Sequence, residues 1–192
     1  MVSHDRLYWP LTSNGEYNSK SVYIWLMSQQ TPSANKQEIK LWKILWALRI
    51  PTHWKVLLWK AYHNALPVGQ NRRLRRLGHS FTCPLCENFE VLTQHLFRDC
   101  ELSKLLWWAS SLAIKVDMNP SIPWTQWICD WILMLHNSQA ANHVGVEIFV
   151  TIVWSIWTFR NQVIHKVVHP TPLMMVDILQ TNLTTLSFVT TR

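Results

Sequence analysis

Four potential metal ligands lie close together near the middle of the chain, and they restrict its fold more than any other feature. Cys83 and Cys86 are separated by two residues, His95 follows after eight more, and Cys100 after a further four. Two cysteines at this spacing can share one tight turn, with both sulfurs about 2.3 Å from the same ion. Three thiolates and one imidazole suit tetrahedral Zn²⁺ with no open position, which predicts a structural site rather than a catalytic one.

The alternative interpretation is a set of reduced core cysteines with a histidine beside them. We favour zinc because all four side chains fall in one short segment. His95 and Cys100 are five positions apart, and at about 100° per residue an ideal helix places them about 140° apart. Both can reach one ion only if the helix ends or bends near Arg98 and Asp99. We interpret Cys129, which lies apart from this group, as a small core residue.

Hydrophobic periodicity and proline positions predict a mainly α-helical chain with a small N-terminal β-hairpin, the helical part stapled by zinc. Asn14-Gly15 is a strong turn signal between two apolar segments, which predicts a hairpin over residues 6–18. Ser19 is then the candidate cap of a short helix over residues 20–27. Further helices are predicted for residues 38–47, 54–66, 71–77, 101–112, 124–135 and 145–166, with a short helical or frayed tail after residue 172.

Positive charge is concentrated in one part of the chain. The formal net charge is +7, and residues 36–81 hold ten lysines and arginines against one acidic residue, Glu38. A compact basic region favours a polyanionic partner, which is nucleic acid or an anionic membrane surface. The candidate phosphate contacts are Lys55, Lys60, Arg72, Arg73, Arg75 and Arg76.

The four arginines between residues 72 and 76 have two interpretations. A guanidinium can bond two phosphate oxygens at once, so the run suits sequence-independent contact with RNA or DNA that weakens as salt rises. The same run is also compatible with a solvated face that acidic residues neutralise in the fold. The zinc segment follows directly, so a bound ion would anchor the position of these arginines.

Thirteen tryptophans are a high number for 192 residues. Most lie at helical spacing among aliphatic residues, so we expect core or interface packing. This group comprises Trp42, Trp46, Trp54, Trp107, Trp108, Trp154 and Trp157. Trp59, next to Lys60, is the candidate to stack on a base if its side chain is exposed.

Several function classes lack their sequence signals. Two-metal phosphodiester chemistry needs clustered carboxylates, and the eleven acidic residues are scattered. Four glycines leave no phosphate-binding loop, and no nucleophile motif occurs. The longest apolar run, residues 144–159, is shorter than the ~20 residues of a membrane span, and residues 1–5 are not a secretory signal. We therefore expect a non-catalytic, intracellular protein with no membrane partner.

The chain resembles the reverse-transcriptase zinc-binding domain of plant non-LTR retrotransposon polyproteins. The resemblance covers about residues 7–108 and rests on Leu41–Pro51, Leu58–Pro67, Arg75–Gly78 and the cysteine and histidine segment. It implies that Cys83, Cys86, His95 and Cys100 are zinc ligands. Residues 156–161 resemble the helical segment that precedes a ribonuclease H domain in such polyproteins.

Two departures from the family pattern are visible. Thr52-His53-Trp54 replaces a turn rich in proline and lysine, and Glu87-Asn88-Phe89 lacks the glycine that often follows the second cysteine. Neither change affects a ligand. From the resemblance we expect a zinc-binding domain over residues 1–112 and a helical extension over residues 113–192, preceding a ribonuclease H-like region that is missing here.

The function we expect is a non-catalytic zinc-binding module that binds RNA or DNA through phosphates, with neighbouring polymerase and ribonuclease H domains as further partners. Three alternatives stay open. The module could serve protein docking, it could be a decayed retroelement fragment without independent activity, or it could be a ribonuclease H-like enzyme if four carboxylates cluster in the fold.

Overall fold

A computed structural model describes residues 8–29, 36–69, 71, 82–87, 91–116, 122–138, 143–166 and 169–190. The chain divides into two compact units, Met1–Lys36 and Gln37–Arg192, which are described separately. The predicted helix over residues 71–77 falls largely outside the described residues. The prediction of a mainly helical fold is confirmed, and the described residues contain no strand.

The described part of the first unit consists of a loop over residues 8–18 and helix α1 (Ser19–Gln29), so the predicted β-hairpin is not supported. The loop closes where the Trp9 amide donates to the Gly15 carbonyl over 2.8 Å. Side chains make the next bonds: the Thr12 hydroxyl donates to the Glu16 carbonyl, and the Asn14 side chain accepts from the Glu16 amide. These local bonds replace the cross-strand ladder that a hairpin needs.

Two residues account for the local structure of this unit. Pro10 has no amide proton to give to a ladder. Asn18, not Ser19, caps α1, because its side-chain oxygen accepts from the Ser21 amide over 2.8 Å. The indole of Trp9 donates to the Ser21 hydroxyl over 2.9 Å, so the loop is fastened to the first turn of the helix.

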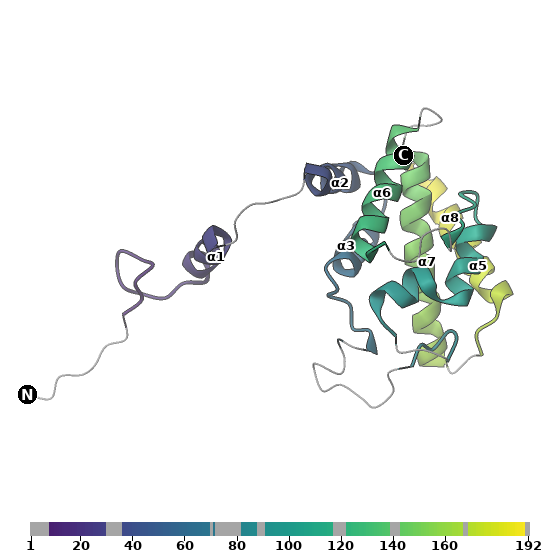
Figure 1. The fold of residues 1–192 in the computed structure, drawn as a ribbon, viewed down its shortest axis with the longest axis horizontal. Coiled ribbons are helices and arrows are strands. Elements are labelled where there is room, and N and C mark those ends of the chain that lie inside the picture. Colours follow the sequence, from purple (N-terminus) through teal and green to yellow (C-terminus); the bar gives the residue numbers. More distant parts are fainter. Residues whose placement is uncertain are drawn as a thin grey trace, which may run out of the picture. The chain divides into compact units, whose positions relative to one another are not determined.

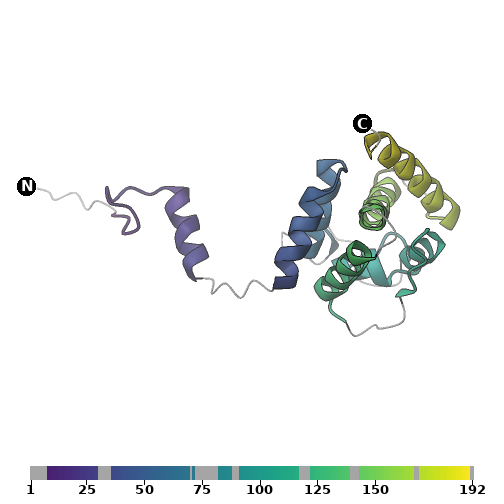
Figure 2. The same cartoon turned by 90° about the horizontal axis from the view of Figure 1, so that it is seen from above.

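The second unit is a bundle of helices around α7 (Val144–Lys166). Figures 1 and 2 show α7 in the middle, with α8 and α5 on one side and α3 and α6 on the other. The other elements of the unit are α2 (Lys36–Ala47), α3 (Thr52–Tyr62), η1 (His95–Asp99), α5 (Glu101–Ala109), α6 (Trp124–Asn137) and α8 (Pro172–Thr190).

Helix α7 is central because most residues of its middle turns are apolar and buried. Phe149, Val153 and Ile156 are fully buried. Two of the polar residues buried with them are satisfied within the helix: the hydroxyl of Thr151 donates to the Glu147 carbonyl, and that of Ser155 to the Thr151 carbonyl. Burial of a hydroxyl is tolerated when it is hydrogen-bonded in this way.

Helix ends differ from the predicted ones where a side chain or a left-handed residue stops the helix. Helix α3 ends at Tyr62 rather than Leu66 because Asn64 has a φ of 50°, which ends the helical geometry. Helix α5 ends at Ala109 rather than Leu112 because the Ser110 hydroxyl turns back onto the Trp107 carbonyl. The expected short tail is instead a long helix, α8.

The tryptophans fall into two groups. Trp54 and Trp107 are buried, and Trp42, Trp154 and Trp157 pack against the core as expected. Trp46 and Trp108 are exposed and so do not belong to the core. Cys129 is buried, which confirms its interpretation as a core residue. Among the described residues, no helix has the length and apolar character needed to cross a bilayer.

Candidate metal centre and basic surface

The two N-terminal cysteines of the site lie on one tight turn. The Cys83 sulfur accepts hydrogen bonds from the backbone amides of Leu85 and Cys86. The turn is closed by the Glu87 amide, which donates to the Cys83 carbonyl over 2.7 Å. Glu87 itself has a left-handed φ of 57°. This is the knuckle geometry that two cysteines need to present both sulfurs to one ion.

A π-helical turn brings His95 and Cys100 to the same side. Element η1 has five residues, and the Cys100 amide donates to the His95 carbonyl over 2.8 Å, an i to i+5 bond. Such wide turns are rare and occur mostly at functional sites. The helix then ends, since Cys100 has an extended backbone and becomes the N-cap of α5. The prediction of an end or bend near Arg98 and Asp99 is confirmed.

Helix α5 stabilises η1 through its buried side chains. The Ser103 hydroxyl donates to the Leu96 carbonyl over 2.6 Å, and the Trp107 indole donates to the Phe97 carbonyl over 2.7 Å. All of these groups are buried, so each carbonyl would otherwise lack water as a partner. The unusual backbone beside the site is therefore held in place by α5.

Arg98 fixes the other side of η1, a role that sequence reasoning missed. Its side chain is buried and contacts the Asp99 carboxylate at 2.6 Å. A second nitrogen donates to the Ile122 carbonyl over 2.6 Å, just before α6. An arginine next to an acidic residue, directly after the apolar pair Leu96-Phe97, is the sequence signal that could have indicated an ion pair with a buried arginine.

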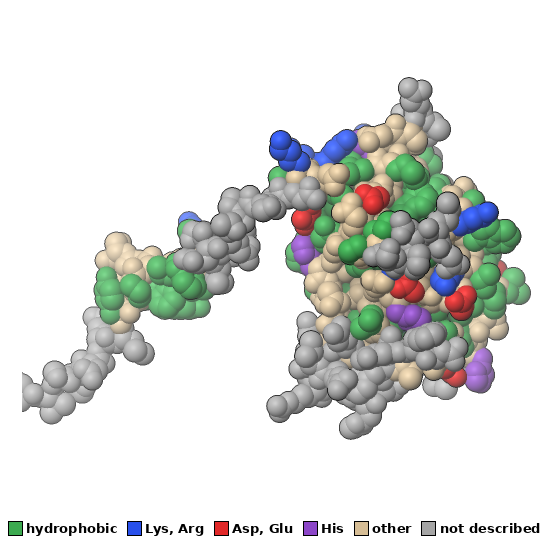
Figure 3. Space-filling model, in the orientation of Figure 1, with side chains coloured by type: hydrophobic (Ala, Val, Ile, Leu, Met, Phe, Trp, Pro, Cys, Tyr) green, Lys and Arg blue, Asp and Glu red, His purple; other side chains and the backbone are tan. Residues whose placement is uncertain are grey.

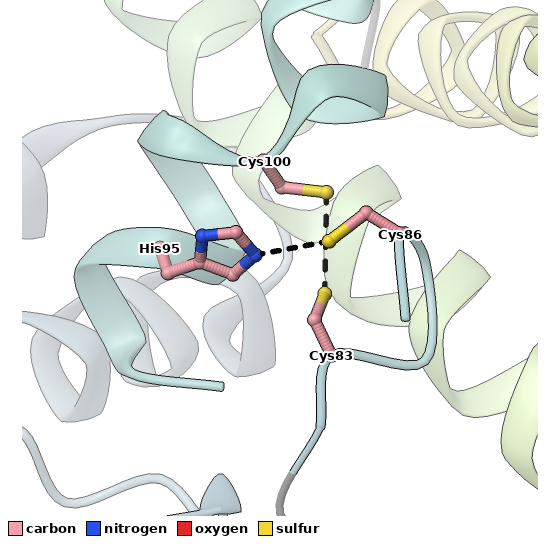
Figure 4. Close-up of side chains that lie close together, drawn as sticks. All are labelled: Cys83, Cys86, His95 and Cys100. Carbon is pink, nitrogen blue, oxygen red and sulfur yellow. Dashed lines mark hydrogen bonds between the residues drawn. The ribbon is translucent and has the colours of Figure 1, made fainter. Parts of the chain in front are cut away.

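The four predicted ligands converge on one point. Their donor atoms all lie within 4.8 Å of one another, as Figure 4 shows. The Cys83 and Cys100 sulfurs are 3.9 Å apart, and the Cys86 sulfur is 3.3 Å from His95 Nε2. A tetrahedral zinc site spaces two sulfurs by about 3.8 Å and sulfur and nitrogen by about 3.6 Å. The donor set and its spacing therefore fit a zinc ion.

The electrostatics of the pair Cys83 and Cys100 favour a thiolate at Cys100. A hydrogen bond from the Cys83 thiol is the main cause that lowers the pKa of Cys100 to about 4, against the opposing effect of burial. His95 and the amides of Leu102 and Ser103 at the start of α5 lower this pKa further. The same hydrogen bond, together with burial, raises the pKa of Cys83.

The predicted phosphate contacts lie in different surroundings. Lys55 is buried, and its ammonium donates to the carbonyls of Trp46 and Leu48 over 3.1 and 2.5 Å. The Lys55 ammonium therefore supplies hydrogen bonds to backbone carbonyls at the C-terminal end of α2, where a positive charge is favourable. Lys60 is exposed on α3. The candidates Arg72, Arg73, Arg75 and Arg76 lie outside the described residues.

Aromatic rings gather near Lys60. The His63 ring lies 5.6 Å from Trp42 and 5.0 Å from Trp59, measured between ring centroids. Trp59 is 41% exposed, which meets the condition set above for stacking on a base. Figure 3 shows lysine or arginine side chains gathered near α2, and Lys43 of that helix is exposed. We call Lys43, Trp59, Lys60 and His63 the α2–α3 surface.

Comparison with known proteins gives a family and a plant relative. Residues 17–107 match the family described as zinc-binding in reverse transcriptase. Over 164 residues the chain is 23% identical to an Arabidopsis thaliana protein named as a ribonuclease H protein. That stretch covers 82% of this chain and 25% of the relative, so the chain spans about a quarter of the relative's length.

No solved structure matches the chain. The family match contains the tight turn, the π-helical turn and all four converging donors. Over residues 17–107 the chain is therefore similar to reverse-transcriptase zinc-binding domains, as the cysteine and histidine pattern indicated.

Proposed function

We propose that Cys83, Cys86, His95 and Cys100 hold one structural Zn²⁺ ion in a non-catalytic, nucleic-acid-binding module derived from a retrotransposon reverse transcriptase polyprotein. The observation that carries the proposal is the convergence of three sulfurs and one imidazole nitrogen within 4.8 Å. These four ligands fill a tetrahedral shell and leave no position for a substrate or an activated water. The ion when bound joins the tight turn to the start of α5.

The proposed nucleic-acid contact combines Lys60 with Arg72, Arg73, Arg75 and Arg76. Lys60 and Trp59 are both exposed on α3, and this supports the assignment, since an exposed cation and an exposed aromatic ring suit a phosphate and a base. Lys55 is not part of the proposed contact because backbone carbonyls already bind its ammonium. Phosphate contacts of this kind do not depend on the base sequence, so they can form with RNA and with DNA.

The polyprotein origin has two supports. The family match is to zinc-binding domains of reverse transcriptases, and the plant relative is named for ribonuclease H and is about four times as long as the aligned stretch. We propose that residues 1–112 form the zinc-binding domain and residues 113–192 a helical extension toward a ribonuclease H-like region. Polymerase and ribonuclease H domains are then natural neighbours of this module.

A binding titration across a salt series tests the nucleic-acid part of the proposal. Zinc-loaded full-length protein is titrated into labelled RNA and into labelled duplex DNA. Affinity is expected to fall as salt rises, with a logarithmic slope of about 0.9 per phosphate contact on duplex DNA. Replacing the four arginines by alanine is expected to lower both the affinity and the slope.

Lys60→Ala is also expected to lower the affinity and the salt slope, but by less, because it removes about one phosphate contact. Lys20→Ala, which removes an exposed lysine of α1 outside the basic region, is the matched control. No binding at low salt would refute a nucleic-acid function, and docking to neighbouring polyprotein domains would then become the leading candidate.

A further inference from the structure

A hollow beside α5 lies apart from the metal ligands and the α2–α3 surface. Its volume is about 500 Å³, within the range of about 300–1,000 Å³ found for small-molecule sites. Glu101, Lys104, Leu105 and Trp108 line it from one face of α5, and residues 114–116 form the facing wall. We call this site the Trp108 hollow.

The shape and lining of the hollow suit a flat apolar group. Trp108 is 60% exposed although it lies on a helix that buries its other face in the core. Leu105 and Ile114 supply aliphatic walls. A large aromatic ring exposed at the edge of an apolar hollow offers a plane on which another ring can stack. A purine or pyrimidine base is such a ring.

The charges at the hollow suit an anionic group attached to that ring. Lys104 and Lys115 stand against one acidic residue, Glu101, so the lining carries a net positive charge. Lys104 contacts Glu101 at 3.1 Å on the exposed face of α5, whereas Lys115 comes from the facing wall. Figure 3 shows basic and acidic side chains next to a hydrophobic patch on the side where α5 lies.

We propose that the Trp108 hollow binds one nucleotide of single-stranded RNA or DNA. The base stacks on the Trp108 indole, and its phosphate contacts Lys115. A duplex does not fit this arrangement because its bases are already stacked and paired within the helix. The inference rests on the proposed nucleic-acid function and deepens it, since it adds a single-strand contact to the phosphate contact of the basic residues.

The metal centre would determine where this hollow lies. Cys100 is the N-cap of α5, and Glu101, the next residue, is the first lining residue of the hollow. A ligand bond at Cys100 therefore fixes the start of the helix face that carries Leu105 and Trp108. On this proposal the zinc ion acts on binding through the position of α5, without touching the nucleic acid.

The test compares single-stranded RNA with a duplex of the same sequence, using zinc-loaded full-length protein and fluorescence anisotropy. Trp108→Ala is expected to weaken single-strand binding about 5- to 100-fold, as loss of one stacked base does, and to leave duplex binding unchanged. Trp108→Phe is expected to restore part of the affinity. Lys115→Ala is expected to lower the salt slope on single strands by about 0.7.

Met134→Ala is the matched control, because Met134 is an exposed apolar residue on α6 that does not line the hollow. Melting curves of all variants check that they fold. Photocrosslinking of RNA that carries a photoreactive base provides a second readout, and the crosslinked peptide is expected to contain Trp108.

Failure of this inference can be told from failure of the proposed function. If Trp108→Ala binds single strands like the wild type while Lys60 and arginine variants lose affinity, the hollow assignment is wrong and the basic contact stands. If the Lys60 and arginine variants bind normally and Trp108→Ala loses affinity, the assignment of the basic contact is wrong and the assignment of the Trp108 hollow stands. If Trp108→Ala only dissociates a dimer in sedimentation and leaves RNA affinity unchanged, the hollow joins copies of the chain and the inference is overturned.

Discussion

At the scale of single residues, Glu87 stands out because its backbone is left-handed, with a φ of 57°. A side chain in this conformation costs roughly 1–2 kcal/mol, which glycine avoids. In the family pattern a glycine often follows the second cysteine, in the stretch that is Glu87-Asn88-Phe89 here, and the left-handed backbone of Glu87 is a physical reason for glycine in this turn. The Glu87 amide donates a hydrogen bond to the Cys83 carbonyl and so closes the turn, with Glu87 in the left-handed conformation.

Glu87→Gly is therefore expected to stabilise the zinc-loaded protein by about 0.5–1 kcal/mol, since relief of the backbone strain exceeds the entropy that glycine adds to the unfolded chain. Chemical denaturation monitored by circular dichroism measures the change. Thr82→Gly, at a neighbouring position without a left-handed φ, is the control and is expected to destabilise. A loss of stability in Glu87→Gly would contradict the argument.

Cys86→Ser tests the ligand set at the same scale. Serine is a poor zinc ligand, so the variant is expected to lose bound metal and at least about 2 kcal/mol of unfolding free energy, because metal binding contributes to folding. Zinc content and denaturation measure the two effects. Cys129→Ser is the matched control: it replaces a buried cysteine outside the cluster and is expected to keep full zinc content. Full zinc content in Cys86→Ser would refute the assignment.

At the scale of elements, η1 and α5 depend on each other. The π-helical turn brings Cys100 round to His95, and α5 donates the Trp107 indole proton to the Phe97 carbonyl. Sequence periodicity predicted a break at this place but not its form, because nothing in periodicity distinguishes a π-turn from a simple helix end. The wide turn is fixed by tertiary hydrogen bonds that only the packed structure shows.

Trp107→Phe tests this dependence. The ring still fills the core, but the buried Phe97 carbonyl loses its donor, so a destabilisation of about 1–3 kcal/mol is expected. Thermal unfolding in the presence of zinc measures it. Trp108→Phe, at an exposed position on the same helix, is expected to change stability by less than about 0.5 kcal/mol. Equal effects of the two substitutions would argue against a role for the indole hydrogen bond.

Other elements show which patterns were sufficient for prediction. The long apolar repeat of α7 and the proline boundary before α6 predicted both helices to within one or two residues. The hairpin prediction relied on Asn14-Gly15 between two apolar segments, and it is not supported because local side-chain bonds satisfy the backbone there instead. Lys55 was predicted to contact phosphate, yet its ammonium donates to carbonyls at the end of α2, a contact between helices that no local pattern reveals.

At the scale of the whole molecule, the metal centre belongs to one unit only. Cys83, Cys86, His95 and Cys100 all lie in Gln37–Arg192, and η1 and α5 pack there against α7 and α8. Helix α1 lies in the other unit. A disturbance at the metal should therefore spread through the helical bundle before it affects the N-terminal part of the chain.

Removal of zinc by a chelator tests this expectation by hydrogen exchange. Amide exchange is expected to rise first in η1 and α5, next to the ligands, and then in α8, which packs on α5 and α7. Exchange in α1 is expected to stay the same. A uniform increase over both units would show that the metal stabilises the chain as a whole.

The 3.9 Å between the Cys83 and Cys100 sulfurs has a consequence for redox chemistry. A disulfide needs its sulfurs about 2.05 Å apart, and at 3.9 Å the two sulfurs already lie next to each other. A bound ion occupies both sulfurs and so protects them from oxidation. Without it, Cys100 is a thiolate next to a thiol, and an oxidant would convert the pair into a bridge that leaves Cys86 and His95 without two co-ligands. In air, metal loss would then become a lasting change until a reductant reopens the site.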